Sequence, residues 1–239
     1  MMFVTPPPPP MTTSNSSHND ADEQQQLLQQ VTCENHTTRL KSYIGKGQAL
    51  LKQMIKSNGR VLHGTNIVKV DSFINHQVDP ELTKLMGLDM AGRFADQKVT
   101  KVLTLESSGI PTALMTALYL NVPLVYARKV KPSTIQEPTF STKVKSFTKN
   151  VEYDVCVSSK YLNASDRVLI VDDFLAVGQA TQGLCELIRQ AGAELVGIGI
   201  CIEKGFQEGG TKLRNKGIRL ESLAIIEKFE NDCVVFREE

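Results

Sequence analysis

The stretch that most restricts the fold is the run Val168-Leu-Ile-Val-Asp-Asp-Phe-Leu-Ala-Val-Gly-Gln-Ala-Thr181. Its four leading aliphatic residues are typical of a strand buried on both faces of a parallel sheet. Asp172 and Asp173 follow directly, then small residues, and the pattern over 179–191 predicts a helix. This order of strand, polar turn and helix predicts an α/β fold with the two aspartates at the tip of a central strand.

The rest of the chain alternates in the same way. A helix is expected from about residue 43 to Asn58-Gly59, and Asp79-Pro80 predicts the start of another. Residues 128–142 are polar and predict a long loop. Further strands are expected over residues 67–70, 99–105, 122–127, 143–148, 151–157, 167–172, 195–203, 218–226 and 232–236, and a further helix over 110–120. Such alternation predicts a mostly parallel central sheet flanked by helices.

Residues 1–42 differ in composition from residues 43–239, which we expect to form the folded domain. The extension contains five consecutive prolines and a Gln-rich segment, and its first 38 residues include no Lys or Arg. Such a segment buries too little apolar area to offset its ordering entropy, so we expect disorder. It also lacks the basic and apolar regions of a secretory signal.

Composition argues against several classes of protein. The net charge of +1 gives no bias toward nucleic acid or anionic membrane, and no apolar run reaches the length of a spanning helix. The five cysteines have no metal-binding spacing and favour a reducing, cytoplasmic setting without disulfides. The four histidines are scattered, which argues against a His-ligated metal.

The adjacent carboxylates of Asp172 and Asp173 call for a chemical reason. One aspartate suffices to cap a helix, whereas two repel each other and favour cations or hydroxyl donors. A ribose supplies two neighbouring hydroxyls. The small residues that follow would let backbone N–H groups converge on an anion at a helix N-terminus. The pattern therefore favours a ribose-phosphate site, and an acidic pocket like that of response regulators is the alternative.

Six segments carry a more specific resemblance. They are Lys69-Val-Asp-Ser-Phe-Ile-Asn-His-Gln77, Leu105-Glu-Ser-Ser-Gly-Ile-Pro111, Tyr126-Ala-Arg-Lys129, Ser146-Phe-Thr148, Val171-Asp-Asp-Phe-Leu-Ala-Val-Gly-Gln-Ala180 and Gly197-Ile-Gly-Ile-Cys-Ile-Glu-Lys204. Over about residues 47–236 the chain resembles the type I phosphoribosyltransferases, and within them the bacterial-type xanthine phosphoribosyltransferases. The resemblance implies their fold, including a small hood from the N-terminal segment of the domain and the C-terminal strands.

The resemblance also implies roles for individual residues. Asp172 and Asp173 would hold the ribose hydroxyls of phosphoribosyl pyrophosphate (PRPP), and Lys204 would reach the base. The turn that would bind the 5-phosphate comprises Ala176, Val177, Gly178, Gln179 and Ala180, and the base pocket would be lined by Val68 and Asn75. This chain has Val68 where the family usually has Leu. It has Val177 where the family usually has Asn, so an unstrained turn requires a negative φ at Val177.

The leaving pyrophosphate would need positive charge. In related enzymes, residues matching Arg128 and Lys129 reach it, often from the neighbouring subunit of a homodimer, although ordinary surface charge explains such residues equally well. The turn that begins at Glu106 would form a second anion site, with Glu106 in the active site as acid, base or cap. Magnesium would be held mainly through PRPP, so the sequence should contain no dedicated cage of metal ligands.

The choice of base depends on Lys204 and Asn75. An ammonium near the end of a buried strand needs an acceptor, which a 6-oxo purine offers and adenine does not. The amide of Asn75 can serve a second carbonyl. We therefore expect a purine salvage enzyme that uses xanthine, with guanine or hypoxanthine as alternatives. A purine- or PRPP-sensing regulator is a third alternative, but the extension is nearly free of Lys and Arg, unlike a DNA-binding module.

Overall fold

The computed structural model describes residues 34–129, 137–146 and 151–238. The chain divides into two compact units, residues 1–38 and 39–239. Of the first unit only residues 34–38 are described. The disorder expected up to residue 42 does not hold for residues 34–41, which are helical.

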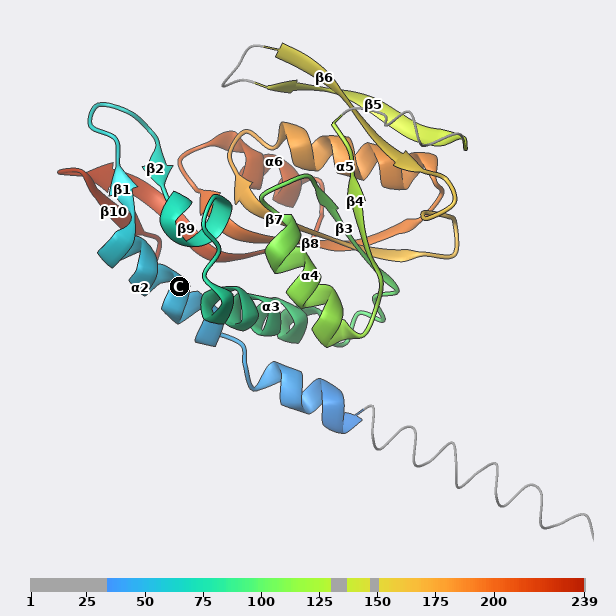
Figure 1. Cartoon of the computed structure of the whole chain (residues 1–239), viewed down its shortest axis with the longest axis horizontal. Helices are drawn as coiled ribbons and strands as arrows, with labels where there is room; N and C mark the ends of the chain where they lie inside the picture. The colour runs from blue at the N-terminus through green and yellow to red at the C-terminus, as the bar shows by residue number, and fades with distance from the viewer. Residues whose placement is uncertain (1–33, 130–136, 147–150, 239) are drawn as a thin grey trace, which may run out of the picture. The chain divides into compact units, whose positions relative to one another are not determined.

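Six strands form the central sheet in the order β10–β9–β8–β7–β3–β4 (Figure 1). All neighbours in this sheet are parallel except the edge strand β10, which is antiparallel to β9. The expected mostly parallel sheet is thereby confirmed. The strands are β3 (Lys101–Leu105), β4 (Leu124–Ala127), β7 (Arg167–Leu175), β8 (Glu194–Lys204), β9 (Leu220–Glu230) and β10 (Cys233–Phe236).

Helices cover both faces of this sheet because its strands are apolar on both sides. Leu169 of β7 belongs to the core beneath α2 (Lys46–Asn58), α3 (Pro80–Phe94) and α4 (Ile110–Leu120). Its neighbour Ile170 belongs to the core beneath α5 (Gln179–Gln190) and α6 (Glu208–Asn215). The antiparallel hairpin of β5 (Thr139–Ser146) and β6 (Val151–Ser158) packs outside α5 (Figure 1).

The element boundaries follow local chemistry in some places and tertiary contacts in others. The start of α3 is confirmed, since the Asp79 side chain accepts a hydrogen bond from the backbone N–H of Leu82 at 2.8 Å. The loop expected over 128–142 is too long, because β5 already begins at Thr139. Helix α6 was not expected, because its sequence contains two consecutive glycines, which disfavour helix.

The hood consists of a short antiparallel ribbon, β1 (Arg60–Val61) with β2 (Val68–Lys69), and the π-helical turn η1 (Asp71–Asn75). The loop of this ribbon meets the end of the β9–β10 hairpin, where His63 Nδ1 lies 3.0 Å from Asp232 Oδ2. The expected hood of N-terminal and C-terminal segments is therefore present.

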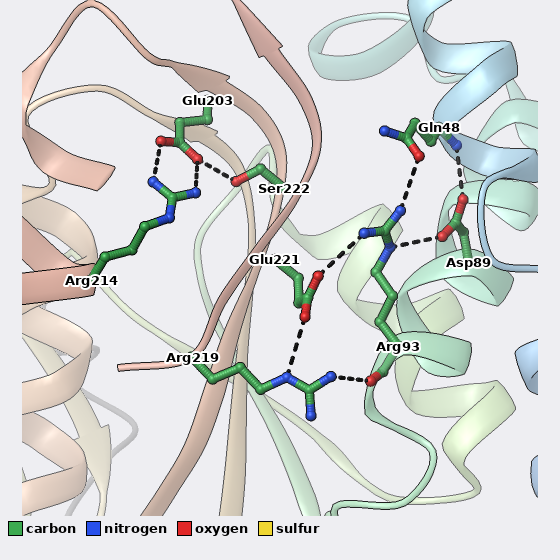
Figure 2. Close-up of polar contacts among 8 residues, drawn as sticks. All are labelled: Gln48, Asp89, Arg93, Glu203, Arg214, Arg219, Glu221 and Ser222. Atoms are coloured by element: carbon green, nitrogen blue, oxygen red, sulfur yellow. Dashed lines mark hydrogen bonds and ion pairs between the residues drawn. The ribbon is translucent and has the colours of Figure 1, made fainter. Parts of the chain in front are cut away.

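Two clusters of polar side chains tie helices to the sheet (Figure 2). In the first, the Arg93 cluster, the fully buried Asp89 accepts hydrogen bonds from Arg93 Nε and from the backbone N–H of Gln48, both at 2.9 Å. Arg93 also reaches Glu221 of β9 at 3.2 Å. The second, the Glu203 cluster, joins Glu203 of β8 to Arg214 of α6 and Ser222 of β9.

Candidate active site

The sequence had suggested that the two aspartates lie at the tip of their strand. In the structure they lie inside β7, which continues to Leu175. On one side, the pairing of β7 with β3 stops at Ile170. On the other side, the pairing with β8 continues to Leu175. Asp172 and Asp173 therefore follow the point where β7 loses one neighbour, at the carboxyl end of β3. This is the place where open α/β sheets bind ligands.

Both carboxylates are nearly out of contact with water. Asp172 is 6% exposed and Asp173 is 8% exposed. The backbone N–H of Asp173 donates to Asp172 Oδ1 at 3.0 Å. Burial and the neighbouring charge of Asp173 raise the pKa of Asp172 well above its usual range. The pair thus offers several acceptor oxygens, and a bound cation or hydroxyl donor would favour its fully charged form.

Asp172→Asn is expected to stabilise the free protein at neutral pH. A carboxyl whose pKa is raised on folding favours the folded state most at low pH, and this contribution is lost as pH rises through the folded pKa. Asn never ionises and keeps the acceptor for the Asp173 N–H. Urea unfolding at pH 7.5 should show a gain of about 1–2 kcal/mol. The gain should shrink as pH falls toward the usual aspartate pKa of about 4. If the variant is less stable than the original protein at pH 7.5, the charge of Asp172 does not destabilise the fold.

The sequence placed Gly109 in a second anion-binding turn, but it did not identify Gly109, Tyr153 or Cys201 as neighbours of the aspartate pair. Gly109, which precedes α4, lies so close that a Cβ atom there would be 2.5 Å from Asp172 Oδ1. Tyr153 of β6 has a raised pKa, because of burial and then the charge of Asp172. Burial raises the pKa of Cys201 to about 12, and both aspartates add to the rise. The thiol of Cys201 is therefore a protonated packing group, as expected for a buried cysteine. The one signal in the sequence was the position of Gly109, a small residue that follows the end of β3 by four residues and directly precedes α4.

The predicted phosphate turn leads directly into α5. Gly178 is the N-cap residue of this helix and has a φ of 83°, so it takes the left-handed conformation that the turn requires. Val177 is not among the described residues with positive φ, so the turn has the unstrained form. The first turn of α5 has no acidic residue and no side-chain cap. Its N–H groups and the helix dipole therefore favour an anion at this place.

Glu106 organises the charged residues at the end of β4. Glu106 Oε2 lies 2.9 Å from Arg128 Nε, and Oε1 accepts a hydrogen bond from the backbone N–H of Lys129 at 2.8 Å. The ammonium of Lys129 lies 5.8 Å from the ring centre of Tyr153, and its charge partly opposes the pKa rise of Asp172. The structure therefore brings Glu106, Arg128 and Lys129 together on the β3–β4 side of the aspartates.

The residues expected around a base lie on the hood side. Lys204, the last residue of β8, donates from Nζ to the backbone carbonyl oxygen of Asn66 at 2.9 Å, and burial lowers its pKa. In the structure the hydrogen-bond acceptor of Lys204 is therefore a backbone carbonyl of the hood. The sequence had suggested that a purine carbonyl would be its acceptor. Val68 is buried in the apolar core, and Asn75 is exposed at the end of η1. Lys204 thus reaches the hood from the central sheet, whereas Val68 and Asn75 belong to the hood itself, in β2 and η1.

Within the described ranges no helix is long and apolar enough to cross a bilayer. The same part of the chain holds no group of three or more His, Cys, Asp or Glu side chains placed to bind a metal ion.

Comparisons with known proteins show which family the chain belongs to. The family described as phosphoribosyl transferase domain matches residues 85–228. The xanthine phosphoribosyltransferase of Oceanobacillus iheyensis is 52% identical over 190 residues, which are 80% of this chain and 97% of that enzyme. The xanthine phosphoribosyltransferase of Moorella thermoacetica is 54% identical over 177 residues, 74% of this chain and 90% of that enzyme.

A solved structure shares the fold at low sequence identity. The adenine phosphoribosyl transferase of Trypanosoma brucei superposes with a TM-score of 0.64 at 19% identity, covering 77% of this chain and 83% of that one. This likeness shows the fold. The family match and the two relatives show that the chain belongs to the phosphoribosyltransferase family.

Proposed function

We propose that this protein transfers the 5-phosphoribosyl group of PRPP to xanthine, which yields xanthosine monophosphate and pyrophosphate in purine salvage. The observation that carries the proposal is the buried pair Asp172–Asp173, whose second member lies six residues before Gln179, the first residue of the uncapped helix α5. Hydroxyl acceptors beside an anion site suit a phosphorylated ribose. The relatives named xanthine phosphoribosyltransferase support the choice of base.

In the reaction, a purine ring nitrogen forms a bond to the anomeric carbon while the bond from that carbon to pyrophosphate breaks. The pyrophosphate oxygen keeps the electron pair of the broken bond, and the proton of the ring nitrogen is released to solvent. Asp172 and Asp173 accept hydrogen bonds from the ribose hydroxyls and hold the ring as positive charge develops on it. The N–H groups from Ala176 to Ala180 bind the 5-phosphate. Arg128 and Lys129, oriented by Glu106, lie on the side where the pyrophosphate departs.

Magnesium fits the described donor set as an ion held mainly by the substrate. Mg²⁺ usually keeps several waters and combines substrate phosphates with one or two carboxylates. Asp172 and Asp173 are the carboxylates that would hold its waters. When bound, the ion neutralises charge on the pyrophosphate.

Lys204 should decide how well a 6-oxo purine is used. We expect Lys204→Ala to lower kcat/KM for xanthine about 10- to 100-fold, because a hydrogen bond from a charged donor contributes about 1.5–3 kcal/mol. Initial rates with PRPP and magnesium, measured separately for xanthine, guanine, hypoxanthine and adenine, test this and the proposed activity together. Lys228→Ala is the matched control, because Lys228 is an exposed lysine paired with Glu230 at 3.2 Å.

Each outcome of this assay has a defined meaning. Fastest turnover of xanthine by the original protein, lost in Lys204→Ala, supports the proposal. If guanine or hypoxanthine is turned over fastest, the proposed phosphoribosyl transfer stands but xanthine is not the preferred base. Turnover of adenine would overturn the role of Lys204, and tight PRPP binding without turnover of any base would favour a sensor.

Residues 43–239 make up the catalytic domain in this proposal, and the protein acts in the cytoplasm as a homodimer. A feature of α4 supports self-association. The helix has no charged residue, and Leu114 and Leu118, one turn apart, are 48% and 61% exposed. Sedimentation equilibrium would give the subunit number.

A further inference from the structure

Helix α6, which no sequence signal pointed to, lies directly against the predicted phosphate turn. The backbone N–H of Gly209, in its first turn, donates to the carbonyl oxygen of Ala176 at 3.1 Å. The contact leaves no room for a side chain. A Cβ atom on Gly209 would collide with the Ala176 carbonyl oxygen and would lie 2.9 Å from the nitrogen of Gly178. The φ of Gly209 lies outside the positive range, so close approach, and not backbone conformation, requires glycine here.

This hydrogen bond fixes the direction of one peptide group in the turn. In a planar trans peptide the C=O and the N–H point in opposite directions. Because the Ala176 carbonyl points at Gly209, the N–H of Val177 points away from α6. Rotation of this peptide would replace an anion-binding donor with a carbonyl oxygen, which repels anions. The orientation of the donor thus depends on where α6 lies.

The Glu203 cluster holds α6 in that place (Figure 2). Arg214 donates from its two terminal nitrogens to the two carboxylate oxygens of Glu203 at 2.7 and 2.8 Å, and Ser222 Oγ donates to Glu203 at 2.6 Å. Glu203 is 2% exposed. A paired, hydrogen-bonded carboxylate of this kind fixes geometry, because moving Arg214 would leave the buried charge of Glu203 without its countercharge. Gly210 allows this contact, since a Cβ there would collide with Glu203 Oε1.

The end of β8 therefore serves two parts of the site. Successive residues of a strand point to opposite faces. Glu203 bonds to α6, whereas Lys204 bonds to the hood loop at Asn66. The two adjacent residues Glu203 and Lys204 therefore connect β8 to α6, beside the phosphate turn, and to the hood loop, beside the expected base.

We propose that Gly209 and the Glu203–Arg214 pair are positioning residues for the 5-phosphate of PRPP, acting through α6 on the Ala176–Val177 peptide. This inference rests on the proposed function, because it assigns the turn to that phosphate. None of the three residues needs to touch the substrate.

The experiment compares Gly209→Ala with the original protein in full steady-state kinetics. We expect the KM for PRPP to rise about 10-fold, with kcat and the KM for xanthine changed less than 2-fold. The affinity for ribose 5-phosphate, measured by calorimetry, should fall by a similar factor. Thermal stability should fall modestly, because the backbone contact is displaced and the better helix propensity of Ala offsets only part of that cost.

Arg214 variants provide the second arm. Arg214→Leu should raise the KM for PRPP, and Arg214→Lys should restore part of the loss. Arg93→Leu is the matched control, because it breaks the other polar cluster of Figure 2, at Asp89 and Glu221. This control should lower stability and leave the KM for PRPP unchanged.

Two results would overturn the inference. One is unchanged ribose 5-phosphate affinity in Gly209→Ala, and the other is an equal rise in KM for PRPP in Arg214→Leu and Arg93→Leu. Failure of the proposed function looks different, because the original protein itself would then not convert xanthine and PRPP.

Discussion

Replacing Asp172 and Asp173 together with asparagine is expected to lower kcat/KM for PRPP about 1000-fold. Each carboxylate, 6% and 8% exposed, would accept a hydrogen bond from a ribose hydroxyl. Hydrogen bonds to a charged group contribute about 1.5–3 kcal/mol each, and two such losses approach 4 kcal/mol in the transition state. Asparagine keeps the shape but removes both charges. Progress curves with xanthine, magnesium and varied PRPP measure the change.

The control is Asp166→Asn, at the residue that precedes the opposite end of the same strand. Asp166 is also buried, but Lys101 Nζ donates to it at 2.8 Å, far along β7 from the aspartate pair. This variant should lose stability and keep its kcat/KM. If the double variant retains more than a tenth of the original kcat/KM, the aspartates do not hold the ribose.

Gly109→Ala is expected to lower kcat/KM for PRPP about 100-fold while the protein stays folded. The φ of Gly109 is −71°, so alanine is allowed by the backbone. The added Cβ would lie 2.5 Å from both Asp172 Oδ1 and Thr104 Oγ1, and because both side chains are buried, the Asp172 carboxylate or the start of α4 must shift. A displacement near 1 Å at a reacting centre costs on the order of 100-fold in rate. Steady-state kinetics, together with circular dichroism to verify folding, test the prediction.

A second glycine separates this effect from simple overpacking. In Gly197→Ala the new Cβ would lie 2.5 Å from the ring of Phe94, in the apolar core near the start of β8. Both variants should lose about 1–3 kcal/mol of stability. Only Gly109→Ala should lose activity. Equal activity in the two variants would show that the Gly109 contact has no part in the site.

Local patterns in the sequence were enough to predict the elements that build the site. Continuous aliphatic runs predicted β3, β7 and β8, and Asp79-Pro80 predicted the start of α3, because these signals act over a few residues. The turn before α5 followed from its small residues. The negative φ required of Val177 is what the structure has, because Gly178 takes the left-handed position.

Contacts between distant segments could not be predicted in this way. The strand β7 runs beyond the aspartates because its partner β8 extends to Lys204, and a single strand's pattern does not reveal its partner's length. Helix α6 contradicts the low helix propensity of its two glycines, because tertiary contacts at Gly209 and Gly210 outweigh that preference. The acceptor for Lys204 was likewise set by a loop far away in sequence.

The strand order has a final consequence for the charge of the ligand. From β3 the chain continues outward to β4, whereas from β7 it continues to β8 and β9 on the other side. The helices that follow β3 and β7 therefore leave on opposite faces of the sheet, α4 on one and α5 on the other (Figure 1). Each helix begins just after the carboxyl end of its strand, so two positive dipole ends flank the single junction between β3 and β7. A molecule with an anionic group at each end and an uncharged ring between them would match that field, so the winding of the chain favours such a ligand before any side chain contributes.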